Sequence, residues 1–201
     1  MIRNIIFDIG NVLINFKPDQ FLRRFINDEY RIKEFLTKVI KTELWLNLDR
    51  GIISLEEARK EYLIRYPGES NLLLTFFAHW KEMLTPITHN IKILRELKSN
   101  DYKVYLLSNY IKEAFDYVVN RNEFFAIVDG KVISSDIKSA KPELKIYQNL
   151  FEKYDLRPER CVFIDDTEAN LHQAQSLNMK TIHYFDGIDL RSELRKLKVN
   201  I

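Results

Sequence analysis

Short apolar runs recur along the chain and are separated by stretches with helical spacing. Five runs have the length of buried strands and are rich in branched or aromatic side chains: residues 2–7, 103–107, 124–128, 161–164 and 180–184. Between them, three patterns predict helices: 91–100, 142–154 and 167–178. Strands that alternate with helices favour an α/β fold whose parallel sheet is covered on both faces.

The helix starts carry recognisable signals. Pro142 falls at the expected first helical position of its segment, where its missing N–H costs nothing. Thr167 precedes the next helical pattern and is expected to cap it with its hydroxyl oxygen.

Residues 17–85 break the alternation, because their pattern is helical throughout and is interrupted only at Gly51 and the Pro67-Gly68 pair. A helical block inserted after the first strand is the pattern of a cap over an α/β core. We therefore expect a core domain of residues 1–16 and 86–201, and a helical cap domain of residues 17–85.

Composition narrows the class of protein. Of 201 residues, 46% are hydrophobic, and 31 basic residues nearly balance 29 acidic ones. A net charge of +2 argues against a dedicated nucleic-acid binder, which would carry a basic excess. The chain has only five glycines, and the closest pair, Gly51 and Gly68, is 17 residues apart. This spacing excludes the dinucleotide-binding and Walker A loops and the nucleophile elbow, which need glycines a few residues apart.

The remaining composition favours a soluble cytoplasmic protein. Cys161 is the only cysteine, so no internal disulfide can form and a reducing compartment is expected. The apolar run at the N-terminus is broken by Asp8 and is too short for a signal peptide. No uncharged stretch approaches the roughly 18 residues of a membrane span.

Polar residues with catalytic potential follow the predicted strands. They are Asp8, the Ser108-Asn109 pair, the Asp165-Asp166 pair, and Lys141 before a helix. Ligands of doubly wound sheets bind at the carboxyl ends of the strands, where these residues would meet. Each alone is more often a cap, a turn former or a solvated charge. Adjacent carboxylates repel each other, however, so the acidic pair favours a bound cation.

In this order, the four segments resemble the motifs of the haloacid dehalogenase superfamily. The matching segments are FDIGNVL at 7–13, LLSN at 106–109, AKPELKIYQ at 140–148 and VFIDDTEAN at 162–170. The form of the first motif and the DRGIIS segment at 49–54 are similar to the branch that contains α-D-glucose-1-phosphate phosphatases. The resemblance covers the whole chain and implies a Rossmann-like core with a helical cap.

The resemblance also implies an activity. It implies a phosphatase that acts on a small phosphorylated metabolite, such as glucose 1-phosphate, with no nucleic-acid or membrane partner. Asp8 would attack phosphorus and form an aspartyl-phosphate. Lys141 would join Asp8 to the phosphate, while Ser108 and the Asn109 N–H would bind phosphate oxygens.

A magnesium ion belongs to the same set of implied features. Its ligands would be Asp8, the Gly10 carbonyl and Asp166. Asp165 and Asn170 would hold a metal-bound water or Lys141 from outside.

The chain departs from the superfamily pattern two residues after Asp8. Most phosphatases of the superfamily carry there an Asp that protonates the leaving oxygen, whereas this chain has Gly10. General acid–base catalysis is worth about 10²–10⁴-fold, so another acid or a good leaving group is needed. Lys138 is a second departure, since relatives often have Gly there.

Two other functions remain open. A metal-independent 2-haloacid dehalogenase also lacks the second Asp of the first motif, but does not keep the paired acids seen at Asp165-Asp166. A catalytically impaired binding protein is the other alternative, and Gly10 is its only support.

Substrate choice would depend on the helical block, which closes over such sites. Candidate residues facing the site are Trp45, Asp49 and Arg50, together with Phe16 and Tyr110 beside the first two motifs.

Overall fold

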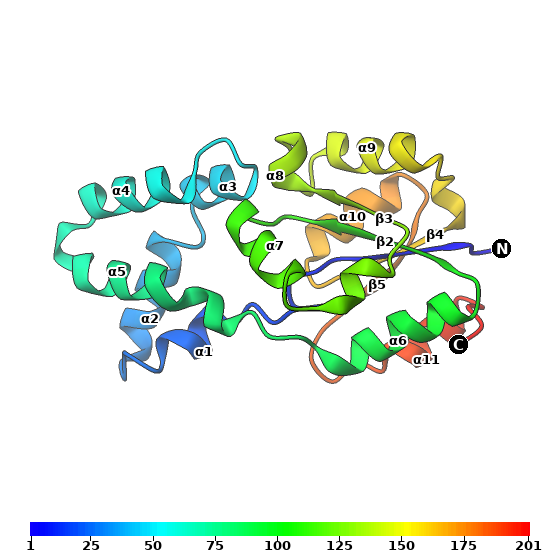
Figure 1. The fold of residues 1–201 in the computed structure, drawn as a ribbon, viewed down its shortest axis with the longest axis horizontal. Coiled ribbons are helices and arrows are strands. Elements are labelled where there is room, and N and C mark those ends of the chain that lie inside the picture. The colour runs from blue at the N-terminus through cyan, green and yellow to red at the C-terminus, as the bar shows by residue number, and fades with distance from the viewer.

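Five short parallel strands form the centre of the fold in the computed structural model, which describes all residues 1–201 (Figure 1). The strands are β1 (Asn4–Phe7), β2 (Lys103–Ser108), β3 (Gly130–Ile133), β4 (Cys161–Asp165) and β5 (Lys180–His183). Their order in the sheet is β3-β2-β1-β4-β5, so β1 lies in the middle. The α/β fold with a parallel sheet is as the sequence predicts.

Alternating side chains of the strands feed two apolar clusters. Ile5 and Phe7 point to one face of the sheet and Ile6 to the other, which is the two-residue period of a strand buried on both sides. The first face is covered by α6 (Thr88–Ser99), α7 (Lys112–Val119) and α11 (Leu190–Lys196). The second is covered by α9 (Leu144–Tyr154) and α10 (Glu168–Ser176).

The chain between β1 and α6 is helical, as its pattern indicates. Its elements are α1 (Pro18–Leu22), α2 (Glu29–Lys38), α3 (Glu43–Asp49), α4 (Leu55–Arg65), η1 (Pro67–Glu69), α5 (Ser70–His79) and η2 (Trp80–Met83). Side-chain oxygens of Asp28, Thr42 and Ser54 cap α2, α3 and α4. These helices lie at one end of the molecule, and both termini lie at the other (Figure 1).

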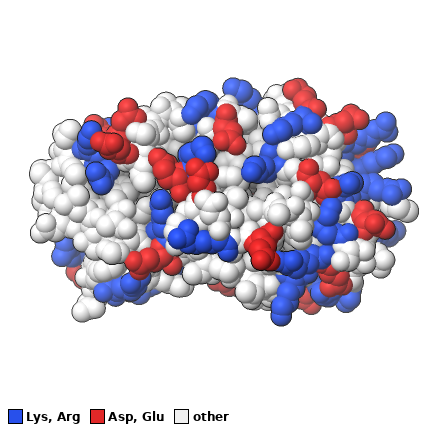
Figure 2. Space-filling model, in the orientation of Figure 1, with Lys and Arg blue, Asp and Glu red and all other residues white.

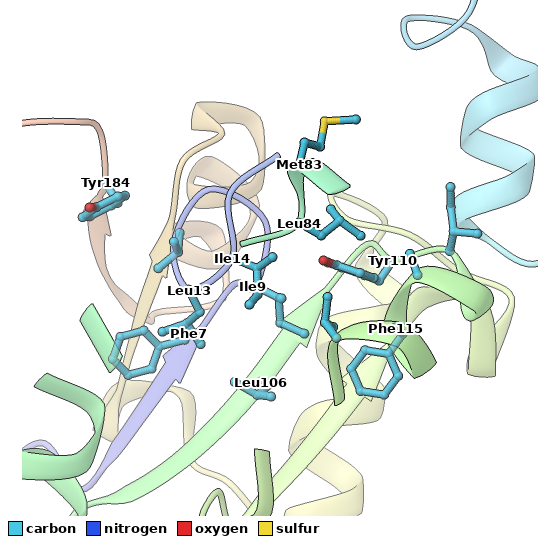
Figure 3. Packing of buried hydrophobic residues seen from close by; sticks show 14 of the residues in the cluster. Phe7, Ile9, Leu13, Ile14, Met83, Leu84, Leu106, Tyr110, Phe115 and Tyr184 are labelled. Atoms are coloured by element: carbon cyan, nitrogen blue, oxygen red, sulfur yellow. The ribbon is translucent and has the colours of Figure 1, made fainter. Parts of the chain in front are cut away.

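Two chain crossings join the helical region to the sheet, and they run side by side. The Ile87 N–H donates to the Leu13 carbonyl, and the Asn15 N–H donates to the Thr85 carbonyl, both at 2.8 Å. Ile14 and Leu84 beside these bonds belong to the larger apolar cluster, which continues from the sheet into the helical region (Figure 3). The helical region is therefore packed onto the sheet rather than tethered to it.

One predicted strand is wrong. Residues 124–128 do not form a strand: Glu123–Ala126 is a 3-10 turn, η3, and the edge strand β3 follows it at Gly130–Ile133. Phe124 and Phe125 stack with ring centroids 4.2 Å apart, which buries the apolar run without a strand. Gly130 is the first residue of β3, and this position requires glycine because the Tyr154 ring occupies the space that a Cβ would need.

Both helix-start predictions are also wrong in detail. Pro142 lies in the loop before α9, which begins at Leu144, because Lys141 and Glu143 are held by hydrogen bonds to Asn109 and Ser139. Thr167 occupies the N-cap position of α10, but its hydroxyl donates to Asp166 instead of capping the helix.

The remaining elements are short: α8 (Ser134–Ile137) and η4 (Pro158–Arg160). Figure 2 shows basic and acidic side chains interspersed over one face, which fits the near balance of charges in the sequence. No helix has both the length and the apolar character that crossing a bilayer requires.

Candidate active site

The carboxyl ends of three adjacent strands bring the candidate residues together. Asp8 directly follows β1, Ser108 ends β2 and Asp165 ends β4, and these strands are neighbours in the sheet. Lys141 reaches the same point from the loop before α9. The site therefore lies in the crevice where ligands of doubly wound sheets bind.

Lys141 bridges two carboxylates in the interior. Its ammonium lies 2.9 Å from Asp8 Oδ1 and 2.6 Å from Asp165 Oδ2. The Lys141 side chain is 1% exposed and that of Asp165 is fully buried. Burial works against the Lys141 charge, but Asp165 and Asp8 outweigh it and raise its pKa. Lys141 is therefore a fixed cation at the centre of the site.

Asp8 is held through one of its two oxygens. Its Oδ1 accepts the Ile9 N–H at 2.7 Å and the Ser108 hydroxyl at 2.6 Å, in addition to the Lys141 ammonium. Its Oδ2 accepts none of the hydrogen bonds in the structure. The carboxylate is thus fixed in orientation and keeps one oxygen for a ligand.

The ionised form of the Asp8 carboxyl is disfavoured at this buried position. Burial raises its pKa to about 7, and Asp165 and Asp166 raise it too, while Lys141 and Ser108 oppose them. One lysine does not balance the acids around it, so the cluster favours a second cation.

Asp165 and Asp166 have different surroundings, although they are adjacent. The buried Asp165 accepts the Asn170 amide at 3.0 and 3.1 Å and the Thr167 N–H at 2.8 Å. Asp166 is partly exposed, and its Oδ2 accepts the Asn11 amide at 3.0 Å. Asp165 is therefore enclosed by protein groups, whereas Asp166, which accepts from Asn11 and Thr167, remains partly exposed.

The residues present fit a magnesium ion. Asp8, Asp165 and Asp166 each offer one carboxylate oxygen, and these oxygens lie within 4.8 Å of one another. Carboxylate oxygens are the donors that Mg²⁺ prefers, and it keeps several waters when few protein ligands are present.

The turn after β1 shapes the floor of the site. The N–H groups of Leu13 and Ile14 both donate to the Ile9 carbonyl, and Asn11 adopts a φ of 53°, a left-handed conformation that asparagine tolerates. The Asn11 side chain also accepts the Phe16 N–H, which fixes its amide toward Asp166.

The Asn109 side chain has a role that the sequence does not predict. Its amide donates to the Lys141 carbonyl at 2.9 Å and accepts the Lys141 N–H at 2.7 Å. This reciprocal pair joins the end of β2 to the loop that carries Lys141. The Asn109 side chain is therefore fully used in positioning that loop.

A cavity of about 210 Å³ opens beside Asp8, between the sheet and the helical region. Its polar wall consists of Asp8, Gly10, Asn11, Asp49, Asn109, Asp166 and Thr167. Its apolar wall consists of Phe16, Trp45, Trp80, Leu84, Tyr110, Ile111 and Ala114. Two wall atoms, the Trp80 indole nitrogen and the Tyr110 hydroxyl, are buried without a hydrogen-bond partner. Figure 3 shows Tyr110 among the apolar side chains near Leu84.

The structure brings together most of the residues that the sequence singles out. Trp45, Asp49, Phe16 and Tyr110 line the cavity as expected. Arg50 does not, because its guanidinium turns away to Glu143.

Lys138 does not extend into the mouth of the cavity either, since its ammonium donates to the Gly51 carbonyl. The cavity residues Trp80 and Leu84 carry no distinctive motif and were not predicted from the sequence.

Comparison with known proteins finds a hydrolase family and two phosphatases similar to this chain. The model of the haloacid dehalogenase-like hydrolase family matches residues 2–176. A sesquiterpene phosphatase of Aspergillus oryzae is 26% identical over 194 residues, which cover 96% of this chain and 94% of that protein. A D-ribitol-5-phosphate phosphatase of Bacteroides thetaiotaomicron is 26% identical over 203 residues, covering 96% and 97%.

A similar solved structure is a HAD family enzyme of Bacteroides thetaiotaomicron in complex with magnesium and inorganic phosphate. It superposes with a TM-score of 0.76 at 23% identity and covers 97% of this chain and all of that one.

Proposed function

The chain belongs to the haloacid dehalogenase-like hydrolases, and from this premise we propose that it is a Mg²⁺-dependent phosphatase that hydrolyses a small phosphomonoester through Asp8. One observation carries the proposal. Asp8 keeps a free oxygen at the edge of the sheet, while Ser108 and Lys141 hold the other oxygen in place. The names of the relatives, two phosphatases, support the same reaction class.

The first chemical step is attack on phosphorus. Asp8 Oδ2, the oxygen without a hydrogen bond, forms the new P–O bond, and the bond from phosphorus to the ester oxygen breaks. The leaving oxygen takes the electron pair and a proton and departs as an alcohol. In the second step, water attacks the aspartyl-phosphate, which releases inorganic phosphate and restores the Asp8 carboxylate.

The protein groups around Asp8 have separate roles in neutralising charge, orienting Asp8 and binding phosphate. Lys141 lies 2.9 Å from Asp8 and offsets the repulsion between the carboxylate and an approaching phosphate. Ser108 orients Asp8, and the Asn109 N–H is available to bind a phosphate oxygen. Asp8, Asp166 and the Gly10 carbonyl would hold Mg²⁺, with Asp165 and Asn170 behind them. When bound, Mg²⁺ supplies the further positive charge that a phosphate dianion requires.

The same geometry weighs against the alternatives. A haloacid dehalogenase needs no divalent cation, but here oxygens of three carboxylates lie within 4.8 Å of one another, and burial together with Asp165 and Asp166 raises the pKa of Asp8. An impaired binding protein has no need for an aligned Asp8–Lys141–Asp165 chain.

The cavity wall bears on the leaving group. A site that reads sugar hydroxyls needs free polar groups, because specificity for hydroxyls comes from hydrogen bonds. Here the Asn109 amide is used by Lys141, and the Asn11 amide by Asp166 and Phe16. The buried wall atoms left without a partner are the Trp80 indole nitrogen and the Tyr110 hydroxyl, which both lie on the aromatic side. The opposite wall is aromatic and aliphatic.

These contacts favour an ester with an apolar leaving group, and the sesquiterpene phosphatase among the relatives supports that choice. A sugar phosphate such as glucose 1-phosphate, suggested by the motif resemblance, is the second candidate. The ribitol-5-phosphate phosphatase supports this class of polar leaving groups.

A phosphate-release panel tests the proposal. Isoprenyl monophosphates, ribitol 5-phosphate, glucose 1-phosphate and p-nitrophenyl phosphate are compared with Mg²⁺ and with EDTA. We expect turnover that requires Mg²⁺ and is abolished in Asp8→Asn, with the highest kcat/KM on an isoprenyl phosphate. Asp116→Asn, an exposed aspartate on α7, is the matched control and keeps full activity. Halide release from 2-chloropropionate without metal, and no phosphate release, would overturn the proposal.

A further inference from the structure

Gly10 leaves the proposed reaction without a proton donor at the usual position. It has no side chain, and a Cβ built there meets no atom within 4 Å. The place from which a general acid would act on the leaving oxygen is therefore open space beside Asp8. An alkoxide is a poor leaving group, so an acid from elsewhere in the chain is required for alkyl esters.

One carboxyl of the helical region reaches this space. Asp49, the last residue of α3, lines the same cavity as Asp8 and Gly10. Apart from Asp8 and Asp166 at the proposed metal site, it is the only titratable carboxyl in the cavity wall. It belongs to none of the close carboxylate contacts at that site, so it is not committed to the metal.

The segment that carries Asp49 is fastened to the sheet side by three contacts. The Ser134 hydroxyl donates to the Asp49 carbonyl at 2.5 Å, and Arg50 pairs with Glu143 at 2.5 Å. The Lys138 ammonium donates to the Gly51 carbonyl. Three successive residues of the helical region are thus held against the segment around Lys141, and Asp49 is held in the wall of the cavity.

The surroundings of Asp49 favour its neutral form. Burial first and the Asp8 charge second raise the pKa of Asp49 to about 7, against the opposing effects of Lys141 and the Trp45 side chain. The other ionisable neighbours are the hydroxyls of Tyr62 and Tyr110. A carboxyl with a pKa near the working pH serves best as an acid in one step and a base in the next.

We propose that Asp49 is the general acid–base of this site and replaces the acid that Gly10 lacks. This inference rests on the proposed phosphatase function. When Asp8 attacks phosphorus, the P–O ester bond breaks and the Asp49 proton passes to the leaving oxygen, which departs as a neutral alcohol. Asp49, now a carboxylate, then takes a proton from the water that attacks the aspartyl-phosphate. Phosphate leaves, Asp8 is restored and Asp49 is again protonated.

Because the acid comes from the helical region, protonation is available only while residues 49–51 are fastened to the sheet side. Closure of the cavity is thus coupled to the chemical step. With Asp49 as the acid, a chain with Gly10 can act on esters whose leaving groups need a proton.

Two esters of similar shape separate this role from a structural one. p-Nitrophenyl phosphate releases a stable phenolate that needs no proton, whereas p-nitrobenzyl phosphate releases an alkoxide that does. We expect Asp49→Asn to lower kcat/KM, which reports the steps through departure of the leaving group, by about 100-fold or more on the benzyl ester and by less than about tenfold on the phenyl ester. The base role in the second step is common to both esters, so its loss lowers kcat on both. In the wild-type protein, kcat/KM on the benzyl ester should fall above about pH 7, and this fall should be absent in the variant.

Gly10→Asp supplies the second arm. In the Asp49→Asn background it should restore at least about tenfold of the lost activity on the benzyl ester, since the new carboxyl extends into open space. Glu61→Gln, an exposed carboxyl of α4 outside the cavity, is the control and should match the wild type on both esters. Thermal unfolding checks that each variant is folded.

The outcomes are distinguishable. An equal loss of kcat/KM on both esters, or no loss on either, overturns the role of Asp49 and leaves the phosphatase standing. An absence of Mg²⁺-dependent turnover of both esters in the wild-type protein overturns the proposed function and this inference with it.

Discussion

Lys141 offers the sharpest test of the electrostatics of the site. Lys141→Met keeps most of the volume of the side chain but removes its charge from between Asp8 and Asp165. Removing one partner of a buried ion pair costs about 3–5 kcal/mol, because a buried charge is left uncompensated. We expect a loss of that size in the free energy of unfolding at pH 8, measured in EDTA.

The loss in the free energy of unfolding should be larger at pH 8 than at pH 5, because Asp8 is ionised only at the higher pH. The pKa of Asp8 is raised to about 7 in the folded protein, so its charge destabilises the fold as pH rises from about 4 to 7. Lys141 opposes this rise, so its removal moves the pKa of Asp8 still higher. At pH 8 that further rise adds up to about 1.4 kcal/mol of loss, which is absent at pH 5, where Asp8 is neutral in both proteins.

Urea unfolding at the two pH values measures this difference. With a slope of about 2 kcal/mol per molar urea, the midpoint at pH 8 should fall by about 2 M. Lys145→Met, an exposed lysine on α9, should change stability by less than about 0.5 kcal/mol. Equal losses at pH 5 and pH 8, or a loss below about 1 kcal/mol at pH 8, would refute the assignment of Lys141 as the cation that neutralises Asp8.

Three further predictions follow from other parts of the structure. Asp166→Ala should abolish the increase in Tm that Mg²⁺ gives the wild-type protein, and an unchanged increase would remove Asp166 from the metal site. Gly130→Ala should destabilise the protein by about 1–3 kcal/mol in urea unfolding, because its Cβ would overlap the Tyr154 ring; no change would show that the ring moves freely. Arg50→Met should lower kcat/KM on alkyl esters by loosening the Glu143 contact, while kcat/KM on p-nitrophenyl phosphate changes less; equal effects on kcat/KM of both esters would contradict the coupling of closure to proton transfer.

The sequence predicts the sheet well where strands are buried on both faces. Ile5, Ile6 and Phe7 form such a run, and so do the residues of β2 and β4. The prediction fails at 124–128, because a buried aromatic pair has the same apolar signature as a strand. The edge strand instead begins at Gly130. Glycine is required there by the ring of Tyr154, which lies 24 residues further along the chain, so no local sequence pattern marks the start of the strand.

The candidate site, too, can be predicted from the sequence only in part. Asp8, Ser108, Lys141 and the acidic pair are found from sequence because each follows or precedes a strand or helix at the same sheet edge. The hydrogen bonds that hold these residues in place cannot be predicted from sequence. For example, the bond from the Asn109 side chain to the Lys141 backbone joins residues that are 32 apart.

The helical region is harder still to interpret from sequence. Trp45, Asp49 and Arg50 are close in sequence on α3 and its end, but only the first two line the cavity. Arg50 is drawn to Glu143 on the sheet side, and that partner becomes visible only when the two regions are packed together.

The central claim is that Asp8 carries the phosphoryl group during turnover. The protein is mixed with Mg²⁺ and a turned-over phosphate ester, quenched in acid within milliseconds, digested and analysed by mass spectrometry. We predict a phosphoryl group on the peptide that contains Asp8 in the wild-type protein and none in Asp8→Asn. Turnover by the wild-type protein with no such adduct, or undiminished turnover by Asp8→Asn, would contradict the account.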